Sequence, residues 1–311
     1  MGNQFRTALL LAVLTMMIVW IGQLIGGRGG MLIALVFAAV MNFGSYWFSD
    51  KIVLRMYRAQ EVTAQQAPDL YNIVSELARN AGLPMPRVYL IPQETPNAFA
   101  TGRNPDHAVV AVTQGLLKLM DRNQVRGVLA HEMAHVKNRD ILIGSIAATM
   151  AGAIMMLASI ARWSALFGGF GRDDREGGGG ALGWIVAAIV APIAAMIVQM
   201  TISRSREYLA DSTGAQIAGT GTGLASALEK LGAYNERLPM QASPSTAHMF
   251  IVNPLSGRSL MNLFSTHPPI EERVARLRGV HFQPPPAPGA GSSPKKQTQA
   301  EQGRAFWDNL K

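Results

Sequence analysis

Two histidines four residues apart enclose a glutamate in the segment His131-Glu132-Met133-Ala134-His135. On a helix, residues four apart project from one face, so both imidazoles can bind one ion while Glu132 lies beside an open coordination position. This pattern is typical of zinc-dependent hydrolysis. The alternative is a pair of histidines on a helix surface. It is disfavoured by the apolar face of the same segment, which comprises Val125, Val128, Leu129 and Met133.

A catalytic zinc needs a third protein ligand and leaves one position to water. The chain has no cysteine, so this ligand must be His, Asp or Glu. Glu207 opens a predicted helix just after an apolar stretch, as His131 lies just before one. Asp211 shares its face and can accept a hydrogen bond from a ligand histidine. The alternative is a solvated helix start in which these carboxylates pair with neighbouring arginines, and the residues alone leave both open.

Four apolar stretches are long enough to cross a bilayer as helices, which takes about 20 residues. Thr7–Ile25 and Met31–Phe48 flank a glycine-rich turn, and Ile141–Ala161 and Ala181–Ile202 form a second pair. The alternative for the second pair is buried core helices, but their length and lack of charge favour spans. We interpret the first stretch as an uncleaved anchor rather than a signal peptide, because another apolar run follows directly.

The charge distribution predicts the topology. Charged residues make up 15% of the chain, against about 25% in soluble proteins. Four spans place 49–140 and the chain after 203 on one side, and that side carries more of the flanking Lys and Arg. By the positive-inside rule this portion and both termini are cytoplasmic. The excess Lys and Arg residues behind the net charge of +8 then lie at the membrane edges. We therefore expect a lipid bilayer, and no nucleic acid, as partner.

The polar portion predicts an α+β fold. Helical spacing covers 67–81, and strands are expected at 87–91 and 108–112 with a loop between them. Further helices are expected from Gln124 through His135, over 203–218, 224–231 and 270–277. We expect Asn97, Ala98, Phe99 and Ala100 to provide an edge strand that pairs with an extended substrate backbone and tolerates many side chains.

Five segments follow from these patterns. They are an N-terminal transmembrane hairpin (1–48), a first catalytic part (49–140), a second transmembrane hairpin with a Gly-rich loop (141–202), a second catalytic part (203–281) and a tail rich in Pro, Gly and Ser (282–311). The composition of the tail cannot bury enough apolar surface to order itself, so we predict disorder there.

Four motifs occur in one order: Pro96–Gly102, His131–His135, Ser203–Asp211 and Thr266–Arg273. Together with the paired spans over about residues 1–280, they resemble the HtpX heat-shock membrane metalloproteases. The Pro-rich tail departs from the usual end of that family.

The resemblance implies a mostly helical, gluzincin-like catalytic domain with four transmembrane helices and one zinc ion per chain. It implies His131, His135 and Glu207 as ligands, Glu132 as general base and Asp211 as the partner of a ligand histidine. His267 would donate a hydrogen bond to the reaction oxyanion, although a helix-capping role before Pro268 fits the sequence equally well. The implied task is cleavage of misfolded or unfolded membrane proteins in the bacterial inner membrane during stress.

Two other interpretations stay open. A CAAX prenyl protease shares the same metal-binding elements, but four spans are too few for the multi-span chamber of that family. A non-enzymatic membrane adaptor would hold structural zinc in a closed site, for which His267 is the plausible fourth ligand. The glutamate at the open position argues against the adaptor.

Overall fold

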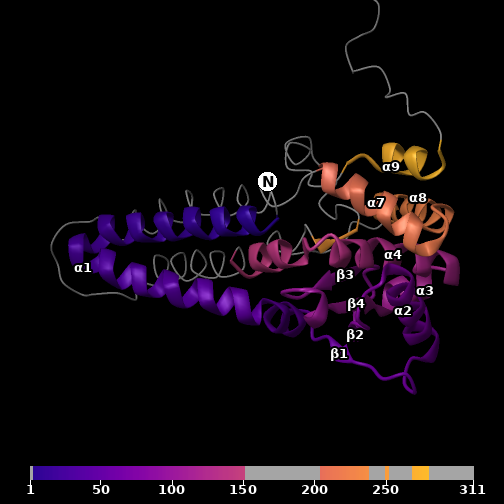
Figure 1. The fold of residues 1–311 in the computed structure, drawn as a ribbon, viewed down its shortest axis with the longest axis horizontal. Coiled ribbons are helices and arrows are strands. Elements are labelled where there is room, and N and C mark those ends of the chain that lie inside the picture. Colours follow the sequence, from indigo (N-terminus) through magenta and orange to yellow (C-terminus); the bar gives the residue numbers. More distant parts are fainter. Residues whose placement is uncertain (1–2, 151–203, 238–248, 252–267, 280–311) are drawn as a thin grey trace, which may run out of the picture. The chain divides into compact units, whose positions relative to one another are not determined.

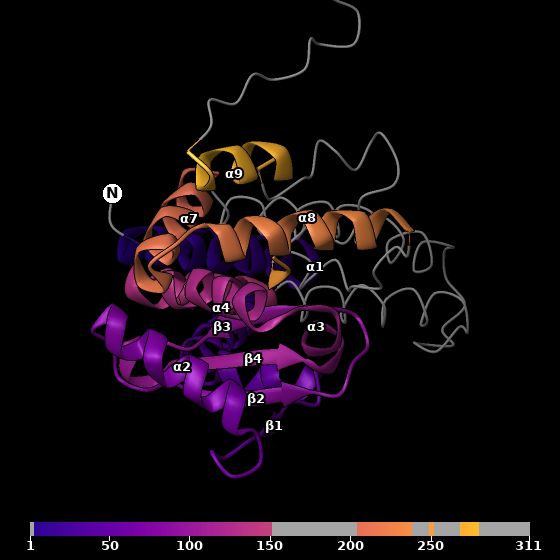
Figure 2. The same ribbon diagram turned by 90° about the vertical axis from the view of Figure 1, so that its right-hand side faces the viewer.

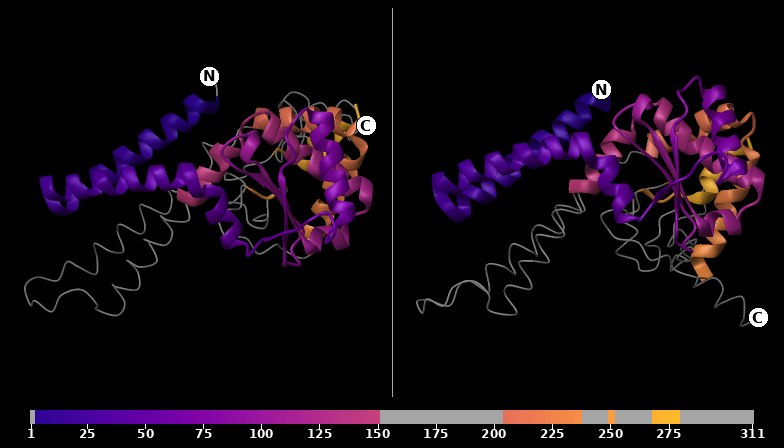
Figure 3. Two further views of the ribbon diagram at one scale, coloured as in Figure 1. Left: turned by 60° about the horizontal axis from the view of Figure 1, so that its bottom comes forward. Right: turned by 90° about the horizontal axis from the view of Figure 1, so that it is seen from below.

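The chain begins with a long apolar helix that folds back on itself (Figures 1 and 3). The computed structural model describes residues 3–150, 204–237, 249–251 and 268–279, which belong to one compact unit. Helix α1 (Asn3–Met56) reverses at Gly27, whose φ of +59° lies in the left-handed region that glycine adopts readily. Across the hairpin, Asn42 Nδ2 donates to Thr15 Oγ1 at 2.7 Å. The reversal falls within the predicted glycine-rich turn.

One described helical segment, Gly27–Met56, is long and apolar enough to cross a membrane. Its most apolar window has a mean hydropathy of 1.7, and only 11% of that window is buried. Shorter apolar helices cover Leu11–Trp20 and Ile141–Met150. Beyond residue 150 the predicted second pair of spans lies outside the described residues, so the four-span topology stays a prediction.

A small mixed sheet follows α1. Its strands are β1 (Gln60–Glu61), β2 (Arg87–Ile91), β3 (Ala98–Thr101) and β4 (Val109–Thr113), in the order β1-β2-β4-β3. β2 and β4 are parallel, whereas β1 and β3 pair antiparallel to their neighbours. All residues of β4 are buried, as expected for a strand covered on both faces. The predicted strands are confirmed within one residue, and β3 lies at an edge of the sheet.

Most helices begin and end within two residues of their predicted limits, but α8 (Thr222–Arg237) continues six residues beyond its predicted end at 231. Their bounds are α2 Pro68–Ala81, η1 Pro105–His107, α3 Gln114–Leu119, α4 Arg122–Lys137, α7 Arg204–Ala218, α8 Thr222–Arg237 and α9 Ile270–Leu277. Helix α4 starts with a capping box in which Asp121 and Gln124 exchange side-chain and backbone hydrogen bonds. The bounds of α9 are those predicted. Helices α3 and η1 were not predicted.

Helix α4 occupies the middle of the domain. Figure 2 shows β2 and β4 on one side of α4, with α7 and α8 on the other and α9 outermost. α4 also contacts β3, α2, α7 and α8. A Cβ added to Gly214 of α7 would lie 2.9 Å from the backbone nitrogen of His131, so only glycine permits this approach of α7 to α4. The contact places the buried face of α7 directly against the predicted site.

Candidate metal centre

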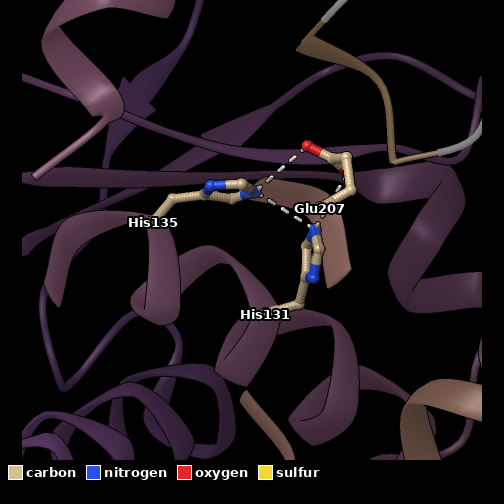
Figure 4. Close-up of side chains that lie close together, drawn as sticks. All are labelled: His131, His135 and Glu207. Carbon is tan, nitrogen blue, oxygen red and sulfur yellow. Dashed lines mark hydrogen bonds and ion pairs between the residues drawn. The ribbon is translucent and has the colours of Figure 1, made fainter. Parts of the chain in front are cut away.

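Helix α4 holds both histidines of the His-Glu-x-x-His segment in its interior face. The side chain of His131 is 2% exposed and that of His135 is 19% exposed. Their Nε2 atoms lie 3.2 Å apart and point toward one another, with the rings nearly perpendicular (Figure 4). Burial lowers the pKa of His131, which favours the neutral imidazole that a metal requires.

Glu207 of α7 completes a group of three donors. Its carboxylate oxygens lie 3.8 Å from His131 Nε2 and 3.8 Å from His135 Nε2. The three ligand atoms lie within 4.8 Å of one another, and Glu207 is buried (Figure 4). Two imidazole nitrogens and a buried carboxylate oxygen form the donor set of a catalytic zinc site. The residues therefore fit a divalent cation.

A buried ion pair between Asp211 and Arg273 contacts His131 at the ring nitrogen that faces away from the donor group. Asp211 Oδ1 lies 2.9 Å from His131 Nδ1, one turn of α7 after Glu207. Arg273 of α9 binds both oxygens of Asp211, with Nε at 2.9 Å and Nη2 at 2.7 Å, and donates from Nη1 to the Ile251 carbonyl at 3.0 Å. Burial alone would raise the pKa of Asp211, but the Arg273 guanidinium outweighs it and holds the pKa at about 2. Asp211 therefore stays an anion that orients the imidazole.

His135 has a matching partner in Asp140. Its Nδ1 lies 3.1 Å from Asp140 Oδ1 and 3.0 Å from Oδ2. Burial opposes a charge on this imidazole, yet Asp140, together with Glu207 and Glu132, raises the pKa of His135 to about 10 in the protein alone. At neutral pH both ring nitrogens of His135 therefore carry a proton, and a cation that binds Nε2 must displace the proton from that atom. Each ligand histidine is thus oriented by a carboxylate at its other nitrogen.

Glu132 contacts the edge strand β3. Its Oε2 accepts a hydrogen bond from the backbone N–H of Ala100 in β3 at 2.9 Å. Burial raises the pKa of Glu132 to about 7. A carboxyl group with this pKa can accept and return a proton near neutral pH.

The other predicted site residues have different surroundings. The side chains of Asn97, Ala98 and Phe99 are buried, and Asn97 ties the strand to Thr113 through its backbone N–H at 2.8 Å. Contact between these residues and a substrate would therefore run through the backbone. His267 lies outside the described residues.

Asp140 and Arg273 were not predicted. Asp140 follows the histidine segment by five residues, and the chain reaches back because Arg139 adopts a left-handed φ of +55°. Sequence offers little sign of that turn, since non-glycine residues rarely adopt it. Arg273 lies on the apolar face of α9 with Ile270, Val274 and Leu277, and an arginine on such a face is a usable signal of a buried partner.

Comparison with known proteins agrees with this geometry. The sequence pattern of peptidase family M48 matches residues 64–281. A protein described as "Protease HtpX homolog" from Desulforapulum autotrophicum is 62% identical over 311 residues and covers all of both chains. Homologs of the same description from Syntrophobacter fumaroxidans and Pyrococcus furiosus are 64% and 55% identical, over 90% and 91% of this chain and 100% and 97% of theirs.

The crystal structure of S. mikatae Ste24p has a similar fold, with a TM-score of 0.50 and 17% identity over 88% of this chain. The chain spans 64% of the length of that protein.

The paired histidines, the buried carboxylate and the apolar helix Gly27–Met56 define a membrane-bound metalloprotease. The chain belongs to peptidase family M48, among the HtpX protease homologs.

Proposed function

We propose that this protein is a zinc-dependent endopeptidase that cleaves misfolded or damaged membrane proteins. The observation that carries the proposal is the donor set of His131, His135 and Glu207 beside the buried Glu132. When bound there, zinc supplies a Lewis acid and a bound water whose pKa is near 7. The family requires a metal, and the nitrogen-rich donor set favours zinc over magnesium or calcium.

Glu132 serves as the general base in this proposal. Its carboxyl group takes a proton from the attacking water and passes it to the leaving amine. The hydrogen bond from Ala100 N–H fixes the orientation of Oε2, and burial keeps the pKa of Glu132 close to the working pH. His267 stays the proposed donor to the oxyanion, on the resemblance alone.

Strand β3 is the proposed substrate platform. The Thr113 N–H donates to the Asn97 carbonyl at 2.9 Å. Backbone groups in an antiparallel pair point to the partner strand at every second residue, so those of Phe99 and Thr101 also point toward β4. Ala98 and Ala100 then turn their backbone groups away from β4, where the Ala100 N–H binds Glu132 and, among the described residues, the Ala98 N–H and both carbonyls stay available to a further strand. An extended substrate can add there as a further strand, beside Glu132. Pairing through the backbone would accommodate many different substrate side chains.

We further propose a multi-pass protein of the bacterial inner membrane, with four spans and with the catalytic portion and both termini in the cytoplasm. The apolar helix Gly27–Met56 supports one span, and the basic residues at the end of α1 support the orientation. The five-segment organisation of 1–48, 49–140, 141–202, 203–281 and 282–311 follows from the same topology.

The test compares purified wild-type protein with Glu132→Gln and Glu207→Ala in detergent. Glu132→Gln should keep its zinc and lose cleavage of an unfolded membrane protein, whereas Glu207→Ala should lose zinc. Full cleavage by Glu132→Gln would reject the mechanism, and unchanged zinc in Glu207→Ala would reject the ligand. Preference for a prenylated peptide would favour the prenyl-protease alternative. An X-ray absorption spectrum that shows zinc bound by three imidazoles and no water would favour the adaptor alternative.

A further inference from the structure

A cavity lies outside the metal centre, where the end of α1 meets the sheet. It has a volume of about 590 Å³. It is lined by five residues of α1, by the start of β2 and by the segment after β3, namely Phe43, Trp47, Phe48, Asp50, Lys51, Arg87, Arg103 and His107. No step of the proposed peptide hydrolysis uses these residues. The aromatic lining residues all lie on α1, which also contributes Asp50 and Lys51, and the remaining lining residues are basic.

The aromatic wall lies at the depth where a membrane span ends. From Gly27 to Trp47 the helix rises about 1.5 Å for each of about 20 residues, or about 30 Å, which is the thickness of the hydrocarbon core. Phe43, Trp47 and Phe48 are 63%, 42% and 46% exposed. Tryptophan side chains such as Trp47 gather at the boundary between hydrocarbon and headgroups. The cavity therefore opens at headgroup depth.

The charges in the cavity are mostly positive. Arg87 Nη2 lies 3.3 Å from Asp50 Oδ2, and this pair is neutral overall. Lys51 and Arg103 have no carboxylate partner among the residues that the structure describes. Arg103 Nη2 donates a hydrogen bond to His107 Nε2 at 2.6 Å. Two positive charges thus stay uncompensated in the cavity.

Both uncompensated cations are held by aromatic rings. The Arg103 guanidinium lies 4.7 Å from the centroid of the Trp47 ring, and the Lys51 ammonium lies 5.5 Å from that of Phe48. These contacts orient the cations without neutralising them. A guanidinium held this way can donate two N–H bonds to one phosphate, while an ammonium adds a point charge.

An apolar stripe leads along α1 to the same cavity. Val36, Val40, Phe43 and Trp47 are spaced by four, three and four residues, so they share one face of the helix, and Val36 and Val40 are 65% and 64% exposed. A soluble phosphate would gain nothing from this stripe. An acyl chain would lie along it.

We propose that the cavity binds the headgroup phosphate of an anionic phospholipid, with the acyl chains along the exposed face of α1. Arg103 and Lys51 bind the phosphate, and Trp47 and Phe48 pack at the glycerol and upper acyl region. The site lies on the side proposed to be cytoplasmic, where anionic lipids and basic pockets between membrane helices meet. It requires α1 to span the membrane and is independent of the hydrolytic step.

The test measures lipid binding by native mass spectrometry on the full-length Glu132→Gln variant in detergent. Because this variant should not cleave peptides, the result for lipid binding does not depend on whether the proposed peptidase activity is correct. Dioleoyl phosphatidylglycerol should bind at least tenfold more tightly than dioleoyl phosphatidylcholine. Arg103→Gln, and independently the exposed Lys51→Gln, should weaken phosphatidylglycerol binding about tenfold, because each removes a charge-assisted contact. Lys137→Gln removes one exposed charge elsewhere on the domain and should change it less than twofold.

Three results would overturn the proposal. Equal binding of the two lipids would remove the role of the anionic headgroup. Equal weakening by Arg103→Gln and Lys137→Gln would show diffuse surface charge instead of a site. Displacement of phosphatidylglycerol by millimolar inorganic phosphate, with the phosphate bound in its place, would assign the cavity to a soluble anion.

Discussion

Replacement of Arg273 by glutamine tests the support of the metal centre at a residue that should touch neither metal nor substrate. Arg273 is 1% exposed and Asp211 is 3% exposed, and two hydrogen bonds at 2.9 and 2.7 Å join them. Loss of one partner from a buried pair leaves an uncompensated charge and costs about 3–5 kcal/mol. The pKa of Asp211 should rise, and the carboxylate would then hold His131 less firmly.

Two measurements check this prediction. In Arg273→Gln the free energy of unfolding in detergent should fall by about 3–5 kcal/mol. Zinc affinity, from competition with a chromophoric chelator, should fall about 10-fold to 100-fold, as is typical when the group that orients a ligand histidine is disturbed. Adding Asp211→Asn to this variant should recover part of the unfolding free energy, because it removes the unpaired charge.

Arg276 provides a matched control on the same helix. Its side chain is 55% exposed, it pairs with Glu272 at 2.9 Å and its guanidinium lies 3.9 Å from the centroid of the Tyr208 ring. Arg276→Gln removes the same charge from the surface and should cost no more than about 1 kcal/mol. The reasoning is refuted if Arg273→Gln loses no more stability or zinc affinity than Arg276→Gln.

Three further predictions concern the same centre. Asp140→Asn should lower zinc affinity about 10-fold to 100-fold in the chelator competition, because the imidazole of His135 loses its orienting carboxylate; unchanged affinity would contradict this. Zinc binding to the wild type should release a proton, because the pKa of His135 is raised to about 10 and zinc displaces its proton. Zinc affinity should therefore fall about tenfold for each unit by which the pH is lowered below that pKa. Calorimetry in two buffers with different ionisation enthalpies should detect the released proton. Gly214→Val should separate α7 from α4 and abolish zinc binding, whereas Gln216→Val at an exposed position of α7 should retain it.

Local patterns made much of the fold predictable. The helix through His131 and His135 follows from apolar spacing and the capping residues before it, and α2, α9 and β2 follow from equally local signals. Strand β1 has two residues, too few for any periodicity, and it exists through its pairing with β2. The prediction therefore succeeded where neighbours in sequence supply the interactions.

The sequence by itself determined that His131 and His135 share a face, because a helix fixes the direction of residues four apart. It also placed Glu207 and Asp211 on one face of a second helix. Only the tertiary structure decided that these two faces meet, through the close approach at Gly214, and that Arg273 neutralises Asp211 from a third helix. Packing between distant helices depends on side-chain volume and charge in three dimensions, which one-dimensional spacing does not encode.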